Sequence, residues 1–111
     1  MKDGQAEEDR AAAALVAAGY TIVERNWRCD AGELDVIARE GSVLAFVEVR
    51  SRSNDEHGHA AEMIGARKRA RVVRAARVYV AFERPIEPEL RFDVVAVTGD
   101  EIEILRDAWR C

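Results

Sequence analysis

The pattern of hydrophobic and polar positions predicts two helices and five strands. Apolar residues at three-and-four spacing favour helices at 6–18, which Gly19 would end, and at 61–82. Alternating or β-branched runs favour strands, which fall at residues 21–26, 33–38, 43–50, 91–97 and 101–105, and residues 27–28 either continue the first strand or start the turn. Two nearby prolines make residues 83–88 a loop. A chain of 111 residues has room for one core, so 1–111 is predicted to be a single domain.

The hairpin predicted within residues 32–52 places its acidic residues on one face. Glu33 and Asp35 lie on the same side of the first arm, and Glu48 lies on that side of the second arm. A turn at Glu40-Gly41 puts Glu33 opposite Glu48 and leaves Asp35 diagonal to it. A longer or displaced turn puts Asp35 opposite Glu48 instead. The apolar residues of the first arm are expected to share the other face: Leu34, Val36 and Ala38.

Carboxylates gathered between apolar strands are costly, because like charges repel and partial burial disfavours ionisation. A divalent cation removes this cost, and carboxylate oxygens suit hard ions such as Mg²⁺ or Mn²⁺. Such an ion activates water and stabilises charge on a phosphoryl group. The alternative is a solvated sheet face on which Glu33 and Glu48 pair with Arg50 and Arg52.

Asp35 followed by Glu48-Val49-Arg50 resembles the divided D…(E/D)-x-K motif of the restriction-endonuclease-like nuclease superfamily. More narrowly, the runs GELDVIA and FVEVRSR resemble the YraN family of small bacterial proteins. Further matching residues span nearly the whole chain in order: Gly4, Glu8, Ala11, Leu15, Gly19-Tyr20, Asn26-Trp27-Arg28, Lys68 and Arg91-Phe92-Asp93-Val94-Val95. The resemblance implies an α/β fold with an αβββαβ core, in which helices flank a mixed central sheet. Holliday-junction resolvases are the implied structural relatives.

The same resemblance implies metal-dependent hydrolysis of DNA. It makes Asp35 and Glu48 the ligands of Mg²⁺ or Mn²⁺, with Glu8 as a supporting catalytic acid, and it makes Asp93 the structural anchor of an arginine. The lysine of the motif is Arg50 here. An arginine stays protonated and cannot act as a base, although it can orient water or bind a phosphate through two hydrogen bonds. A non-catalytic module that binds nucleic acid or a partner therefore stands as the alternative to a nuclease.

Glu8 shares a helical stripe with small and apolar residues, which are Ala11, Ala12, Leu15 and Ala18 or Gly19. An acid on the core-facing side of a helix suggests a functional role. The alternative is that Glu8 simply favours the positive end of the helix dipole.

The second helix carries the one concentrated positive surface that the sequence predicts in this acidic chain, with six of the 17 Lys and Arg residues. Its buried stripe is predicted at Met63, Ile64, Ala70, Val73, Ala76 or Arg77, and Val80. Cations on the exposed side suggest contact with DNA phosphates, and the nucleic-acid-binding candidates are Arg52, Arg67, Lys68, Arg71 and Arg74. The alternative is a solvated face whose cations pair with acids.

Composition and charge limit what the protein is expected to bind and where it is expected to be found. A net charge of −4 argues against a generally basic protein that coats nucleic acid, so binding requires a local positive surface. No apolar stretch is long enough for a signal peptide or a membrane span, so a cytoplasmic protein with no membrane partner is expected. The segment 51–60, with His57-Gly58-His59 and no third ligand, reads as a loop rather than a zinc site. A second copy of the chain is a candidate partner through the last strand or the hairpin.

Overall fold

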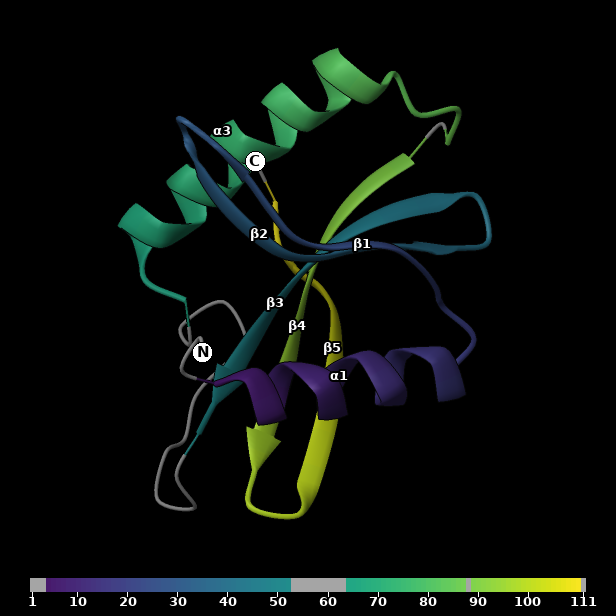
Figure 1. Cartoon of the computed structure of the whole chain (residues 1–111), viewed down its shortest axis with the longest axis vertical. Coiled ribbons are helices and arrows are strands. Elements are labelled where there is room, and N and C mark those ends of the chain that lie inside the picture. The colour runs from purple at the N-terminus through teal and green to yellow at the C-terminus, as the bar shows by residue number, and fades with distance from the viewer. Residues whose placement is uncertain (1–3, 53–63, 88, 111) are drawn as a thin grey trace.

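The computed structural model describes residues 4–52, 64–87 and 89–110. Its elements in chain order are α1 (Gln5–Ala17), β1 (Thr21–Cys29), β2 (Gly32–Glu40), β3 (Val43–Ser51), α3 (Ala66–Glu83), β4 (Glu89–Thr98) and β5 (Glu101–Trp109). They form one sheet in the order β1-β2-β3-β4-β5 (Figure 1). Every pair of neighbouring strands is antiparallel except β3 and β4, which α3 connects as a parallel crossover. The predicted mixed α/β fold with an αβββαβ core is confirmed, and β5 extends it at the edge.

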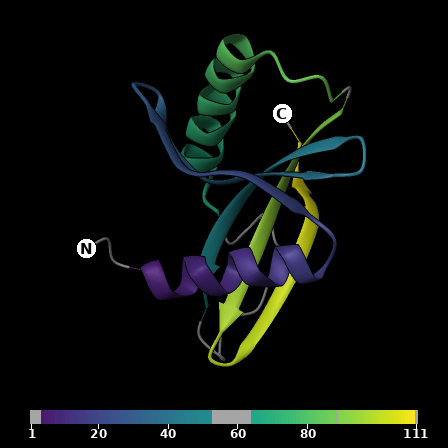
Figure 2. The same ribbon diagram turned by 45° about the vertical axis from the view of Figure 1, so that its right-hand side comes forward.

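The two helices cover different parts of the sheet. Figure 2 shows α1 crossing the region of β3, β4 and β5, whereas α3 runs beside the β1–β2 hairpin. Each helix has its own apolar cluster. The cluster under α1 comprises Ala11, Leu15, Tyr20, Val36, Ala38, Ala45, Val47, Val95 and Val97. The cluster under α3 comprises Leu34, Ile37, Leu44, Phe46, Ile64, Val72, Ala75, Ala76, Tyr79, Phe92, Val94 and Trp109.

Helix α1 agrees with the prediction. Its buried residues are Glu8, Ala11, Ala12 and Leu15, as expected from the spacing, whereas Ala18 and Gly19 at the end of the predicted stripe are exposed. Ala18 caps the helix, and Gly19 follows it with a φ of 103°, a conformation that glycine adopts without steric cost.

Helix α3 corrects the prediction at its start and in its orientation. The helix begins at Ala66, after Gly65, while residues 61–63 lie outside the described part of the chain. Its buried residues are Val72, Ala75, Ala76 and Tyr79, whereas Ala70 is exposed and Val73 and Val80 are only half-buried. Because small apolar residues stand at consecutive positions of α3, the sequence pattern alone allows two overlapping stripes to be the buried one. The ring of Tyr79 selects one of them, because it packs edge-on against Trp27 at 5.3 Å and Phe46 at 5.9 Å between centroids.

The hairpin of β2 and β3 adopts the second of the two predicted registers. Its turn is Gly41-Ser42, one residue later than Glu40-Gly41, and Gly41 has a φ of 60°. The ladder runs from Glu40 opposite Val43 to Val36 opposite Val47. The next residues along the two strands are Asp35 and Glu48.

The two apolar clusters break the alternation of faces along β2 next to Asp35, which makes one prediction wrong. Leu34 packs in the cluster under α3, not beside Val36 and Ala38 under α1. The regular β2–β3 ladder ends at Val36, and Asn26 on the neighbouring β1 has a φ of 55°. Strict alternation along β2 therefore fails at this point.

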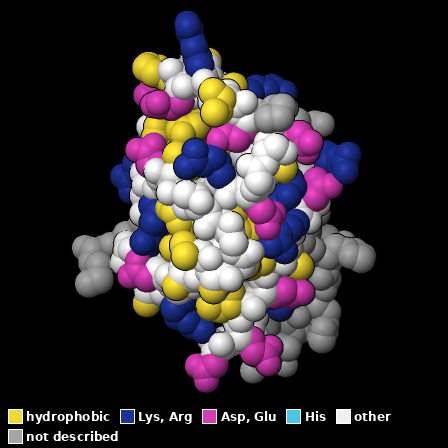
Figure 3. All heavy atoms as spheres, turned by 90° about the vertical axis from the view of Figure 1, so that its right-hand side faces the viewer, with side chains coloured by type: hydrophobic (Ala, Val, Ile, Leu, Met, Phe, Trp, Pro, Cys, Tyr) yellow, Lys and Arg dark blue, Asp and Glu magenta, His cyan; other side chains and the backbone are white. Residues whose placement is uncertain are grey.

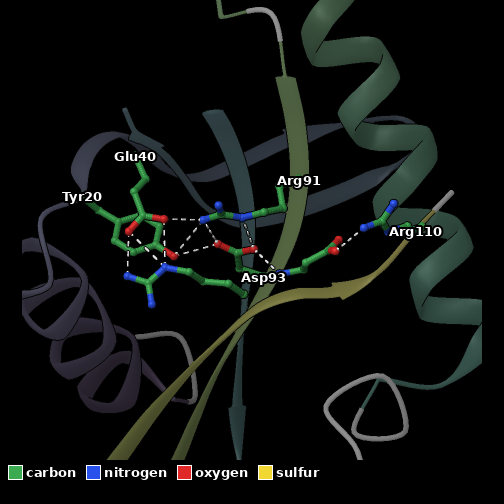
Figure 4. Close-up of polar contacts among 7 residues, drawn as sticks. Tyr20, Glu40, Arg91, Asp93 and Arg110 are labelled. Atoms are coloured by element: carbon green, nitrogen blue, oxygen red, sulfur yellow. Dashed lines mark hydrogen bonds and ion pairs between the residues drawn. The ribbon is translucent and has the colours of Figure 1, made fainter. Parts of the chain in front are cut away.

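A network of charged and hydroxyl groups joins β4 to Tyr20, which directly precedes β1, and to strands β2 and β5 (Figure 4). Asp93 is fully buried and accepts hydrogen bonds from the Tyr20 hydroxyl at 2.8 Å and from Arg91 Nε at 2.8 Å. Arg91 also donates to Glu40 at 2.6 Å, and Arg106 donates to Glu40 through two nitrogens. The hydrogen bonds from Arg106, followed by those from Arg91, lower the pKa of Glu40 to about 2. Asp93 thus anchors an arginine, as predicted.

Figure 3 shows the face that carries the β2–β3 turn, and on it acidic and basic side chains are interspersed.

Within the described residues, neither helix is long and apolar enough to span a membrane. The predicted loop containing His57 and His59 lies outside the described residues.

Candidate functional site

Asp35 and Glu48 face each other where β2 and β3 part. The backbone N–H of Asp35 donates to Glu48 Oε2 at 3.2 Å, and the N–H of Val49 donates to Asp35 Oδ2 at 3.0 Å. Each carboxylate thus accepts a backbone hydrogen bond from the opposite strand, just beyond the last ladder pair. These reciprocal bonds hold the two acids side by side and satisfy backbone donors that the ladder leaves free.

The carboxyl group of Glu48 lies in an electrostatically unfavourable place. Its side chain is 1% exposed, and its Oε1 atom has no hydrogen-bond partner among the described residues. Burial, followed by the negative charge of Asp35, raises the pKa of Glu48 to about 8. A cation at Oε1 would favour the ionised form and supply the missing partner.

A polar hollow of about 250 Å³ lies beside these acids. Its lining residues come from the start of α1, from β2 and β3, and from the first turn of α3: Gly4, Glu7, Glu8, Glu33, Asp35, Val49, Ser51 and Lys68. Four carboxylates and one ammonium group therefore converge on a small volume. We refer to this hollow as the acid cavity.

Glu8 reaches the acid cavity from α1. Its side chain is 6% exposed and follows the inward stripe of the helix, and its backbone N–H donates to the Gly4 carbonyl at 2.9 Å. Glu8 and Asp35, which lie far apart in the sequence, therefore line one hollow.

The donor set suits a hard divalent ion with few protein ligands. Asp35 and Glu48 supply carboxylate oxygens, and Glu48 Oε1 is buried without a hydrogen bond from residues 4–52, 64–87 or 89–110. Across the described ranges, no three His, Cys, Asp or Glu side chains lie close enough together to bind one ion. Mg²⁺ commonly keeps several waters and binds one or two carboxylates, so the pair fits it without a third acid.

Arg50 does not join the acids. It is exposed at the end of β3, opposite Ala96 of β4, and it does not line the acid cavity. Lys68 is the cation beside the acids, with Nζ 3.7 Å from Glu48 Oε1. It lies four residues before the buried Val72, on the core-facing side of α3. The predicted buried stripe of α3 put Lys68 on the exposed side of the helix. The sequence therefore predicted Lys68 only as a contact to DNA phosphates.

The other predicted DNA-binding cations lie outside the acid cavity. Arg67, Arg71 and Arg74 are exposed on α3, and Arg74 lines a separate hollow together with Trp109. Arg52 is held by the last two strands, because it donates to Thr98 Oγ1 at 3.1 Å and forms an ion pair with Glu103 at 3.3 Å.

These features define a class of protein: a mixed α/β fold with a paired-carboxylate centre where two strands diverge. The model of the uncharacterised protein family UPF0102 matches residues 7–97, and the chain belongs to this family, which is the YraN family of the sequence resemblance.

UPF0102 proteins of several bacteria are similar to it over nearly their full length. The one from Hahella chejuensis is 47% identical over 97% of this chain and 90% of its own length. The one from Syntrophus aciditrophicus is 41% identical over 98% of this chain and 89% of its own length. The one from Shewanella amazonensis is 42% identical over 98% of this chain and all of its own length.

Proposed function

We propose that this protein is a metal-dependent nuclease that hydrolyses phosphodiester bonds in DNA, including branched or damaged DNA. One observation carries the proposal: Asp35 and Glu48 are held against each other at a strand divergence, and a buried oxygen of Glu48 has no hydrogen bond to any residue that the structure describes. A protein keeps such an unfavourable pair of carboxylates where a ligand of opposite charge relieves it.

The residues have distinct roles in this proposal. Asp35 and Glu48 hold Mg²⁺ or Mn²⁺, and Glu8 keeps the acid cavity negative from the side of α1. The bound ion supplies the Lewis acidity that lowers the pKa of water and neutralises charge on the phosphate. The exposed cations Arg50, Arg67, Arg71 and Arg74, together with the half-buried Arg52, contact the DNA backbone without reading its sequence.

The reaction is an ordinary hydrolysis. The oxygen of one water molecule forms a bond to phosphorus while the bond from phosphorus to one deoxyribose oxygen breaks. The departing oxygen takes up a proton, so the products are one phosphomonoester end and one hydroxyl end. No oxidant or further co-reactant takes part.

The test compares cleavage of linear and branched DNA by the wild type, Asp35→Asn and Glu48→Gln. The wild type should cut with Mg²⁺ or Mn²⁺ and not with a chelator. Each variant should lose about a hundredfold or more, because a two-carboxylate centre cannot lose one ligand and keep its ion. The exposed edge-strand variant Glu101→Gln is the matched control and should cut normally. Cleavage that survives in Asp35→Asn would refute the proposal.

The position of Arg50 favours a second candidate, which is a module that binds nucleic acid or another partner without cutting it. An arginine outside the acid cavity cannot do the work of a motif lysine inside it. Salt-sensitive DNA binding, with no cleavage in Mg²⁺ or Mn²⁺, would favour this candidate.

A further inference from the structure

We propose that Lys68, from α3, is the functional cation of the acid cavity, in place of the motif residue Arg50 on β3. Its Nζ lies 3.7 Å from Glu48 Oε1, the buried oxygen that has no hydrogen-bond partner in the described part of the chain. Lys68 lines the acid cavity together with Asp35, whereas Arg50 does not. The inference rests on the proposed function for its role in cleavage, but the position of the charge is independent of it.

The packing of α3 fixes the direction of Lys68. Val72 and Ala75 follow it by four and seven residues, and both are buried against the sheet. The start of β2 also lies close to the helix, because a Cβ atom at Gly32 would be 3.8 Å from Cβ of Arg71. Rotation of the helix to turn Lys68 away would expose Val72 and Tyr79, so the ammonium group faces the acids as a result of core packing.

The Lys68 side chain is half exposed, while that of Glu48 is 1% exposed. Its ammonium group lies 3.7 Å from a buried carboxylate oxygen, while the side chain remains accessible to solvent. A compact ammonium carries its charge on a flexible stem, so it can leave Glu48 for a phosphate oxygen without a change in the backbone. A guanidinium at the exposed position of Arg50 has no such contact with the acids.

A cation in this position has two opposite effects. It repels a divalent ion bound by Asp35 and Glu48, and it attracts the phosphate of a substrate bound to that ion. Removal of its charge should therefore tighten binding of the ion alone and weaken the reaction on DNA. A lysine that only supported the fold would produce neither change in this combination.

The test begins with Mn²⁺ alone, titrated into the full chain by calorimetry without DNA. Lys68→Met, which keeps the apolar stem, should bind Mn²⁺ about three- to tenfold more tightly than the wild type, allowing for solvent screening of a half-exposed charge. Lys68→Arg should stay close to the wild type. Arg50→Met is the matched control, and its affinity should change less than about twofold, because an exposed charge away from the cavity is screened.

The second readout is cleavage of DNA in Mn²⁺ by the same variants. Lys68→Met should lose about a hundredfold, and Arg50→Met should lose less than about tenfold. Thermal unfolding in chelator checks that each variant is folded, and Lys68→Gln replaces Lys68→Met if that variant is not.

The outcomes separate the two proposals. If the wild type binds Mn²⁺ but cuts no DNA, the nuclease proposal fails while the affinities of the variants still decide the role of Lys68. An unchanged affinity in Lys68→Met, or a larger change in Arg50→Met, would overturn the assignment of Lys68. A wild type that binds no Mn²⁺ would overturn both proposals.

Discussion

Replacing Glu48 by glutamine should stabilise the ion-free protein near neutral pH, although it removes a proposed metal ligand. Burial and the charge of Asp35 raise the pKa of Glu48 to about 8, whereas in the unfolded chain its pKa returns to the ordinary value of 4.5. A raised pKa in the folded state contributes stability below pH 4.5, and this contribution is lost as pH rises through about 8. Glutamine is nearly isosteric and does not titrate, so its variant should lack this loss.

The size of the effect follows from the shift. Between about pH 5 and pH 8 the wild type could lose at most about 4 kcal/mol through this group, at about 1.4 kcal/mol for each pH unit. Glu48 titrates together with Asp35, so we expect about half of that, or about 2 kcal/mol. For a domain of this size the corresponding change in melting temperature is about 10 °C.

The assay is urea or thermal unfolding of wild type and Glu48→Gln in chelator, repeated across this pH range. The stability of the wild type should fall relative to Glu48→Gln as pH rises. Mg²⁺ or Mn²⁺ should restore stability in the wild type but not in Glu48→Gln. Glu101→Gln, at an exposed position, should follow the wild type in both respects. The reasoning would be refuted if Glu48→Gln were the less stable protein at about pH 8, or if it kept the stabilisation by the ion.

Three further predictions concern residues outside this pair. Asp93→Ala should cost about 3–5 kcal/mol in urea unfolding, because it leaves Arg91 without its buried partner, and a loss below about 1 kcal/mol would contradict this. Glu40→Gln should reduce stability by about 1 kcal/mol at neutral pH but not near pH 2, because the arginines depress its pKa and its contribution disappears as pH falls from 4.5 towards 2. An equal effect at both pH values would argue against the ion pair with Arg106. Arg50→Lys, which restores the motif lysine, should change DNA cleavage less than about threefold, and a large gain would show that position 50 does reach the site.

Much of the fold follows from patterns within short stretches of chain. The stripe of Glu8, Ala11 and Leu15 predicted α1 and its buried acid, since helical spacing alone decides which residues share a face. The αβββαβ order, implied by family resemblance, is also the order that the structure has. The strands were predicted to within a few residues, with β5 extending to Trp109 instead of residue 105 because Trp109 stacks on Phe92.

The errors arose where contacts between distant segments choose among equivalent local patterns. The buried side of α3 depends on Tyr79 meeting Trp27 and Phe46, which no spacing within the helix reveals. The turn at Gly41-Ser42 and the break in alternation next to Asp35 depend on how β2 pairs with β1 and β3. A rotation of α3 about its axis is enough to decide whether Lys68 lies on the surface or beside Glu48.

By itself, the sequence determined the class of fold, the helix that carries Glu8, and the two acidic residues of the hairpin, because these follow from periodicity and from residue types close together in the chain. Only the tertiary structure decided that the carboxylate of Glu48 accepts from the Asp35 N–H and that of Asp35 from the Val49 N–H. It also decided that Lys68 and not Arg50 stands beside them, and that Glu8 lines the same cavity. The physical reason is that side-chain packing across the sheet sets register and helix rotation, and these convert residues far apart in the chain into neighbours.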